Sequence, residues 1–136
     1  MQKFLLGFLI LILGVHIAGN IYGWYLTTHL DIPMHIAGGA WVALFFFYLF
    51  SQRSGNFLPD NKLVQLIFAL GFVALIGVGW EFYEYLADVF IKHNTAFGCM
   101  QPGTLFDTLK DLFDDLIGGT VAAGVMLVHK KRISIF

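Results

Sequence analysis

The stretch 107–119, DTLKDLFDDLIGG, places four carboxylates and one lysine in the first half of an otherwise apolar segment. On a helix, Asp107, Asp111 and Asp114 share one stripe, and Asp115 lies at the edge of that stripe. Carboxylates inside a bilayer are energetically costly, so an acidic stripe in a membrane helix marks a functional site by default. Such acids need partners from the rest of the chain.

The composition is that of an integral membrane protein. Of the 136 residues, 58% are hydrophobic and 12% are charged, with a mean hydropathy of +0.76, whereas soluble domains carry about 25% charged residues. The net charge is −1 and no basic patch occurs, so we expect no nucleic-acid partner. Cys99 is the one cysteine, which excludes an internal disulfide and a CxxC motif. The length allows about four spans of roughly 20 residues.

These features predict an all-α, polytopic membrane protein with one transmembrane domain over residues 1–136. Asp31 followed by Pro33 is typical of a helix start, with Asp31 as the cap. Thr104 and Asp107 fit a capping box at the start of the last span. We expect four spans, at about 4–27, 31–50, 63–90 and 104–128.

The basic residues predict the orientation of these spans. Four spans place most of the lysines and arginines on one side of the membrane, with Lys92 on the other. Because short cytoplasmic loops carry an excess of Lys and Arg, both termini are expected in the cytoplasm of a multi-pass cell-membrane protein. The residues on the predicted inner side are Lys3, Arg53, Lys62, Lys130, Lys131 and Arg132.

The titratable groups of the spans fall at one level. With about 1.5 Å of rise per residue, His35, Glu81 and Asp111 all lie in the outer half of the predicted bundle, while the inner half is almost uniformly apolar. This arrangement predicts a polar cavity open to the outer face. Clustered carboxylates cannot all be ionised without compensation. They can share protons, pair with Lys110 and the histidines, or bind a cation.

Carboxylate oxygens with one imidazole suit Mg²⁺, Mn²⁺ or Ca²⁺ better than Zn²⁺, whose structural sites usually contain Cys or several His. His35 and Glu81 are also the candidates for a catalytic acid or base, in which case the reaction would be metal-assisted hydrolysis or transfer at a lipid phosphate. The candidate ligands are Asp111, Asp114, Asp115, Glu81 and His35, with Asp31, Glu84 and Asp107 as possible additions.

Simpler roles compete with these assignments. Asp31 and Asp107 fit helix caps, while Glu84 and Asp88 fit solvated residues at the outer end of the third span. In the first span, His16 and Asn20 are best interpreted as interhelical hydrogen-bonding residues, worth about 0.6 kcal/mol per contact. Tryptophans in membrane proteins face lipid or the interface by default, and the same is expected of Trp24, Trp41 and Trp80.

Three short motifs between about residues 31 and 124 carry a resemblance to known families. They are Asp31-x-x-x-His35, Glu81-x-x-Glu84 and Asp111-x-x-x-Asp115-x-x-Gly118. Together they resemble the VanZ-like group of small membrane proteins and the similar YjdF-like integral membrane proteins.

The VanZ-like pattern has Gln at the position of Glu84 and Asn at that of Asp115, so the YjdF-like group is the closer match. The resemblance implies a bacterial or archaeal cell-membrane protein. VanZ-like members are associated with glycopeptide-antibiotic resistance, but the resemblance implies no defined activity for this chain. Asp107-x-x-x-Asp111 looks like part of the CDP-alcohol phosphotransferase motif, whose preceding Asp-Gly and Ala-Arg elements are absent. UbiA-type prenyltransferases need Asp-rich motifs on two helices, and only one such run occurs.

Three functional hypotheses follow. The first is a cell-envelope protein whose outward-facing acidic pocket binds a cation and, through it, an anionic lipid or envelope head group. The second is a cation- or proton-coupled transporter. The third is a non-catalytic assembly or regulatory subunit in which the acids hold helices together. The sequence leaves the oligomeric state open.

Overall fold

The structure is a computed structural model that describes residues 1–53, 58–90 and 105–133. Within these ranges the chain is helical and contains no strand, which confirms the all-α prediction. The elements are α1 (Gln2–Tyr22), α2 (Trp24–Thr27), α3 (Asp31–Phe47), the π-helical turn η1 (Tyr48–Arg53), α4 (Lys62–Phe90) and α5 (Leu105–Ile133).

Three of these helical segments are long and apolar enough to cross a membrane. They are Gln2–Tyr22, Asp31–Phe50 and Lys62–Ala87. Helix α5 has 29 residues, which is sufficient length, but its first half carries the acidic stretch. The multi-pass prediction therefore rests on three helices, and a span by α5 stays a prediction.

The first predicted span is interrupted at Gly23. Helix α1 ends at Tyr22, where Gly23 has φ 68° and its N–H bonds the carbonyl of Gly19. Glycine reaches this left-handed conformation without steric cost, which makes it the usual residue at a helix C-terminus. Chain 24–27 then forms the separate turn α2. The helix over the predicted span 4–27 is therefore not continuous, because it is interrupted at Gly23.

The predicted cap at Asp31 is also wrong. The N-cap position of α3 is Leu30 and no side chain caps it, while Asp31 lies in the first turn of the helix. The carboxylate of Asp31 bonds Lys110 of α5 instead. Asp31 therefore forms an ion pair with a helix that is distant in the sequence, in place of the expected hydrogen bond to the backbone of its own helix.

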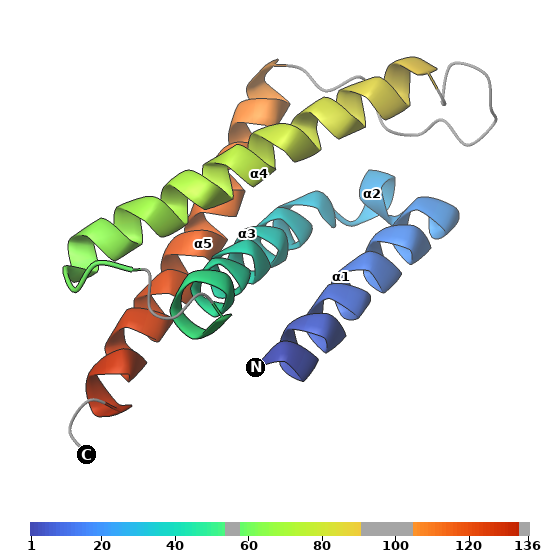
Figure 1. Ribbon diagram of the computed structural model, residues 1–136. Helices are drawn as coiled ribbons and strands as arrows, with labels where there is room; N and C mark the ends of the chain where they lie inside the picture. Colours follow the sequence, from blue (N-terminus) through green and yellow to red (C-terminus); the bar gives the residue numbers. More distant parts are fainter. Residues whose placement is uncertain (54–57, 91–104, 134–136) are drawn as a thin grey trace.

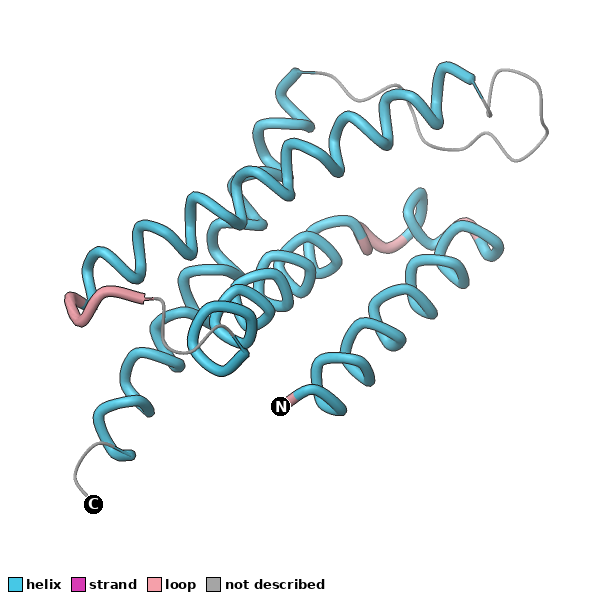
Figure 2. Tube along the Cα trace, in the orientation of Figure 1, coloured by secondary structure: helices cyan, strands magenta, loops and turns pink. Residues whose placement is uncertain are grey.

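Helix α3 is central, because α1, α4 and α5 all pack against it (Figures 1 and 2). Helices α4 and α5 also contact one another, so α3, α4 and α5 form a three-helix bundle with α1 along one side of α3. The first residues of α1, the last described residues of α5 and the start of α4 lie toward the same end of the molecule (Figure 1). That end is the one predicted to face the cytoplasm.

Helices α3 and α5 touch backbone to backbone at two glycines. A Cβ atom on Gly39 of α3 would overlap the carbonyl of Asp115, and one on Gly118 of α5 would overlap the carbonyl of Ile36. Small residues allow such close approach between membrane helices. The crossing brings the acidic turns of α5 beside the first turns of α3.

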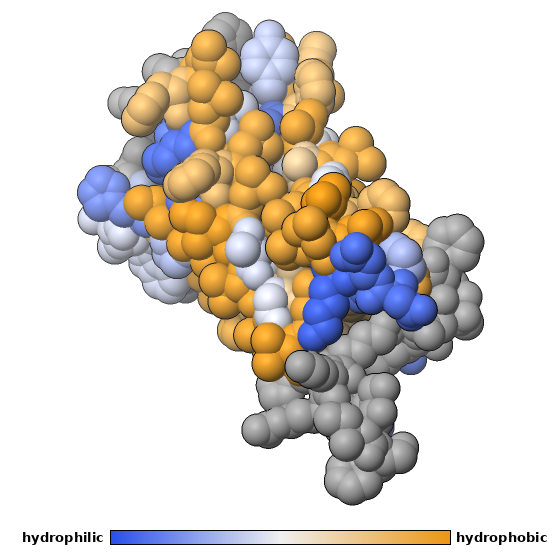
Figure 3. All heavy atoms as spheres, turned by 90° about the vertical axis from the view of Figure 1, so that its left-hand side faces the viewer, coloured by the Kyte–Doolittle hydropathy of each residue, from blue (hydrophilic) through white to orange (hydrophobic). Residues whose placement is uncertain are grey.

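Beyond this crossing, the bundle has an apolar core. Phe46 of α3 packs its ring against Phe72 of α4, with the two centroids 5.7 Å apart. Much of the outer surface is apolar as well, as the face in Figure 3 shows. The buried core residues are Val42, Ala43, Phe46, Phe47, Leu58, Ala69, Val73, Ala122, Ala123 and Leu127.

Candidate functional site

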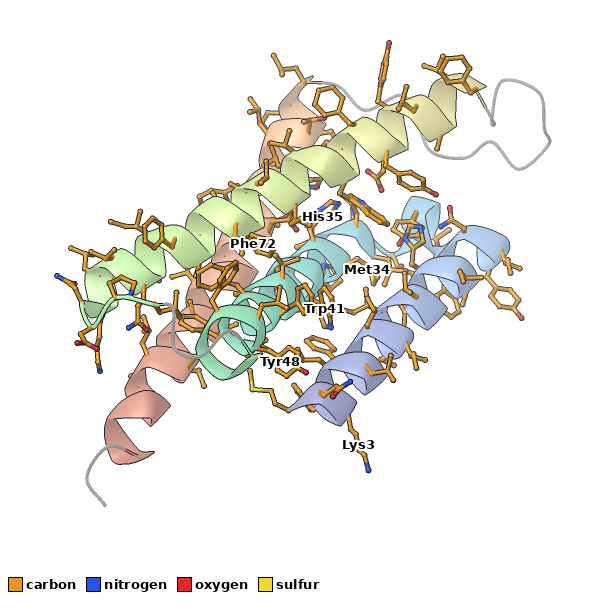
Figure 4. The ribbon with its side chains drawn as sticks, in the orientation of Figure 1. Lys3, Met34, His35, Trp41, Tyr48 and Phe72 are labelled. Carbon is orange, nitrogen blue, oxygen red and sulfur yellow. The ribbon has the colours of Figure 1, made fainter. Side chains whose placement is uncertain are left out.

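His35 lies at the centre of the polar end of the bundle. It is one turn inside α3, only 6% exposed, and points toward α4 and α5 (Figure 4). Its Nε2 atom lies 3.5 Å from Asp31 Oδ1 and 3.9 Å from Asp111 Oδ2. Its Nδ1 atom lies 3.4 Å from Asp115 Oδ1. Both ring nitrogens thus face carboxylates, and the imidazole bridges α3 and α5.

Lys110 contacts one group of carboxylates, which we call the lysine cluster. The ammonium lies 2.9 Å from Asp31 Oδ2 and bonds the carboxylate of Asp111. Asp107 Oδ1 and Asp114 Oδ2 lie 3.8 Å and 4.0 Å from the same nitrogen. A single cation on α5 therefore contacts the acidic stripe of its own helix and the start of α3.

The second group of acids lies on α4 and is called the glutamate cluster. Glu81, Glu84 and His35 each offer a ligand atom within 4.8 Å of the others, so these three residues could hold a metal ion. Trp80 Nε1 donates a hydrogen bond to Glu84 Oε1 at 2.9 Å. Glu81 Oε1 is buried and has no hydrogen-bond partner among the described residues. Within the same residues, no lysine or arginine pairs with either glutamate.

Asp31, His35 and Asp111 form another possible metal-binding group, again with ligand atoms within 4.8 Å of one another. This group and the glutamate cluster differ in whether a positively charged side chain is already bound. Lys110 already bonds both aspartates of this group. A metal ion there would have to displace an ammonium, whereas the glutamate cluster would present only imidazole and carboxylates.

A cavity of about 240 Å³ opens next to the glutamate cluster. It lies between α1, α3 and α4, and α5 contributes Asp115 to its lining. At one end it is polar, with Asp31, His35, Glu84 and Asp115. Its remaining walls are mostly apolar or aromatic and include Leu9, Ile12, Leu13, Met34, Trp41, Val42, Val73 and Ile76.

The structure brings the predicted site residues together in two groups. His35 of α3 lies beside Glu81 and Glu84 of α4, with ligand atoms within 4.8 Å of one another. Asp107 and Asp114 contact Lys110. Two further predictions, the side chain of Asp88 and the capping residue Thr104, lie outside the described residues.

Several aromatic residues and one glutamate have roles that differ from those expected. Glu84 is partly buried and lines the cavity, so it is not the solvated residue of the simpler interpretation. Trp41 and Trp80 line the cavity too, and Trp41 Nε1 donates to the Leu5 carbonyl at 2.8 Å. The default expectation that these tryptophans face lipid or the interface is wrong. The spacing of Trp80 and Glu84, four residues on one helix face, is the sequence signal for their contact.

His16 and Tyr25 close the polar end of the cavity on the side of α1. His16 Nδ1 lies 2.6 Å from the Tyr25 hydroxyl, and the His16 ring meets the Trp80 ring edge-on at a centroid distance of 5.5 Å. Burial raises the pKa of the Tyr25 hydroxyl above its ordinary value, so this group stays neutral. Asn20 bonds His16 within α1, so the interhelical role expected of Asn20 is wrong.

The comparisons with known proteins agree with a membrane protein. The chain belongs to the family described as predicted membrane protein (DUF2238), whose model matches residues 1–132. No curated protein and no solved structure matches the chain.

Proposed function

We propose that the protein binds a divalent cation with His35, Glu81 and Glu84, and that this cation holds the anionic head group of a membrane lipid. The observation that carries the proposal is the unequal distribution of positive charge, because the described part of the chain places a lysine beside the aspartates and none beside the glutamates. Lys110 bonds Asp31 and Asp111 and lies 4.0 Å from Asp114 Oδ2, a buried atom that has no hydrogen-bond partner among the described residues. Glu81 Oε1 is buried without such a partner too, and no described lysine or arginine pairs with Glu81 or Glu84. A cation between the glutamates would supply that missing partner.

The donor set favours Mg²⁺ or Mn²⁺. Two carboxylates and one imidazole are too few ligands for a closed protein cage, so coordination positions remain open. Mg²⁺ in particular is commonly held by one or two carboxylates together with phosphate oxygens of a ligand. A lipid phosphate or carboxylate would complete such a shell at the polar end of the cavity.

We also propose α5 as the fourth span, with both termini in the cytoplasm and the clusters near the outer face. The charges of α5 that would prevent insertion contact His35 and Asp31 of α3, and polar residues inside membranes usually face the bundle in this way. The VanZ-like and YjdF-like resemblance is in keeping with this plan. In this proposal the lysine cluster has a structural role, holding α5 against α3.

A transporter is less favoured by the structure. A continuous path would have to cross the half of the bundle beyond Gly39, where the described core residues, such as Ala43 and Phe47, are apolar and buried. Proton flux into liposomes that Asp114→Asn abolishes would support a transporter instead.

Metal binding tests the proposal directly. The detergent-purified protein is titrated with Mn²⁺ and the free ion is followed by electron paramagnetic resonance, with elemental analysis of the untreated protein. We expect one bound ion per chain, lost in the Glu81→Gln/Glu84→Gln double variant. Asp60→Asn, which removes an exposed carboxylate two residues before α4, is the matched control and should retain the ion. A folded wild-type protein that binds no Mn²⁺ would overturn the proposal.

A further inference from the structure

We propose that the cavity between α1, α3 and α4 holds the alkyl chain of the ligand, so that the ligand is a single-chain anionic amphiphile from the membrane. This inference rests on the proposed function, because the cation at the glutamate cluster would hold the head group. It adds the chemical class of the ligand and the position of its chain.

The cavity has the polarity of an amphiphile. Its polar end is next to the glutamate cluster and contains His35 and Glu84. Away from this end, α1 contributes Ile12 and Leu13, and α4 contributes Val73 and Ile76. A polar head group would contact the polar end, and an alkyl chain would contact the apolar walls. A wholly polar ligand would leave the apolar walls unused.

The shape of the cavity fits a chain that runs along the helices. The lining residues of α3 extend from Asp31 to Val42, a rise of about 16 Å at 1.5 Å per residue. The lining residues of α1, from Leu9 to His16, cover about 10 Å in the same way. An alkyl chain in a bilayer has this elongated form and direction.

The size of the cavity indicates one chain rather than two. Its volume of about 240 Å³ lies just below the range of roughly 300–1,000 Å³ that is typical of sites for drug-sized ligands. Helix α1 forms one wall of the cavity. Helix α1 is connected across the cavity by the Trp41–Leu5 hydrogen bond and by the ring contact of His16 with Trp80.

Native mass spectrometry with two ligand probes tests the inference. The purified protein is incubated with dodecyl phosphate and Mg²⁺, or with dodecyltrimethylammonium, and the adducts that survive release from the micelle are counted. We expect one dodecyl phosphate per chain, lost when EDTA removes the metal. The quaternary amine should give no adduct, because the bound cation would repel it.

A matched pair of variants locates the chain. Ile12 lines the cavity, whereas Ile10, two residues earlier on the same helix, is 61% exposed. Ile12→Trp should reduce the adduct by about tenfold or more, because an overfilled cavity must repack to admit a chain. Ile10→Trp should leave it unchanged, and both variants should still bind Mn²⁺.

A second variant applies if Ile12→Trp does not fold. Gly38 lines the cavity, and a Cβ there meets only Asp115 Oδ1, at an ordinary 3.9 Å. Gly38→Val is then compared with Gly79→Val, where a Cβ has no neighbour within 4 Å. The first should reduce the adduct and the second should not.

The possible failures are distinguishable. Stoichiometric Mn²⁺ without a dodecyl phosphate adduct, or an adduct that persists in both cavity-filling variants, would overturn the inference and leave the metal site intact. An adduct of the quaternary amine that needs no metal would overturn the anionic class. Absence of Mn²⁺ binding would overturn the proposed function, and the inference with it.

Discussion

The two ends of the α3–α4–α5 bundle are held together by different forces. At the polar end, His35 and Lys110 connect helices through carboxylates of α3 and α5. At the apolar end, Phe46, Phe47 and Val73 are almost completely buried and interact by packing alone. The glycine crossing at Gly39 and Gly118 lies between these two regions.

This difference has an energetic consequence in a bilayer. Packing apolar side chains against one another gains little over packing them against lipid, since lipid tails are as apolar as leucine. Removing one partner of a buried ion pair leaves an uncompensated charge, at a large energetic cost. We therefore expect the polar end to be the more sensitive to substitution, which reverses the usual order in soluble proteins.

The largest effect is expected from Lys110→Met. It leaves Asp111, whose side chain is 5% exposed, without its cation, and should lower the free energy of unfolding by about 3 kcal/mol. Unfolding in mixed SDS micelles measures this change. Lys3→Met, at an exposed position of α1, is the control and should have little effect. Adding Asp111→Asn to Lys110→Met should recover part of the loss, and a purely additive result would contradict the ion-pair explanation.

Gly118→Ala should have the next largest effect. The added methyl group would overlap the Ile36 carbonyl and force α5 away from α3, at a cost of about 2 kcal/mol. Gly124→Ala on the same helix has no atom within 4 Å and should be neutral or slightly stabilising. Equal melting temperatures for the two variants would show that the helices do not approach closely at Gly118.

Val73→Ala probes the apolar end. Val73 is 1% exposed and packs over Gly119, so its truncation leaves a small void worth about 1 kcal/mol. Val78→Ala, at a 40% exposed position of α4, should change stability much less. If Val73→Ala lowered the free energy of unfolding in SDS more than Lys110→Met does, the expected order of the two ends would be contradicted.

The smallest effect is expected from Trp41→Phe, which belongs to neither end. It removes the hydrogen bond to the Leu5 carbonyl that connects α3 with α1, and such bonds in membranes average about 0.6 kcal/mol. Cysteines placed on α1 and α3 would report a faster rate of disulfide crosslinking if α1 moves more freely. An unchanged rate would mean that other contacts hold α1.

Much of the site could be predicted from the acidic stretch because helix periodicity places residues three and four apart on one face. Asp107 and Asp114 contact Lys110 for this reason, and Asp115 lies at the edge that faces His35. The division of the acids into a lysine cluster and a glutamate cluster could not be predicted. This division depends on the helix toward which the Lys110 side chain extends. The ammonium bonds Asp31 of α3, which lies 79 positions earlier in the chain.

By itself, the sequence determined the helical membrane fold and the level at which the polar groups gather. Both follow from local quantities, namely the hydropathy of each segment and the rise per residue of a helix. The tertiary structure decided that Asp31 pairs with Lys110 instead of capping its own helix, and that Trp41 and Trp80 line a cavity. Those outcomes depend on the distance and rotation between helices, which backbone contacts at Gly39 and Gly118 set and no single segment contains.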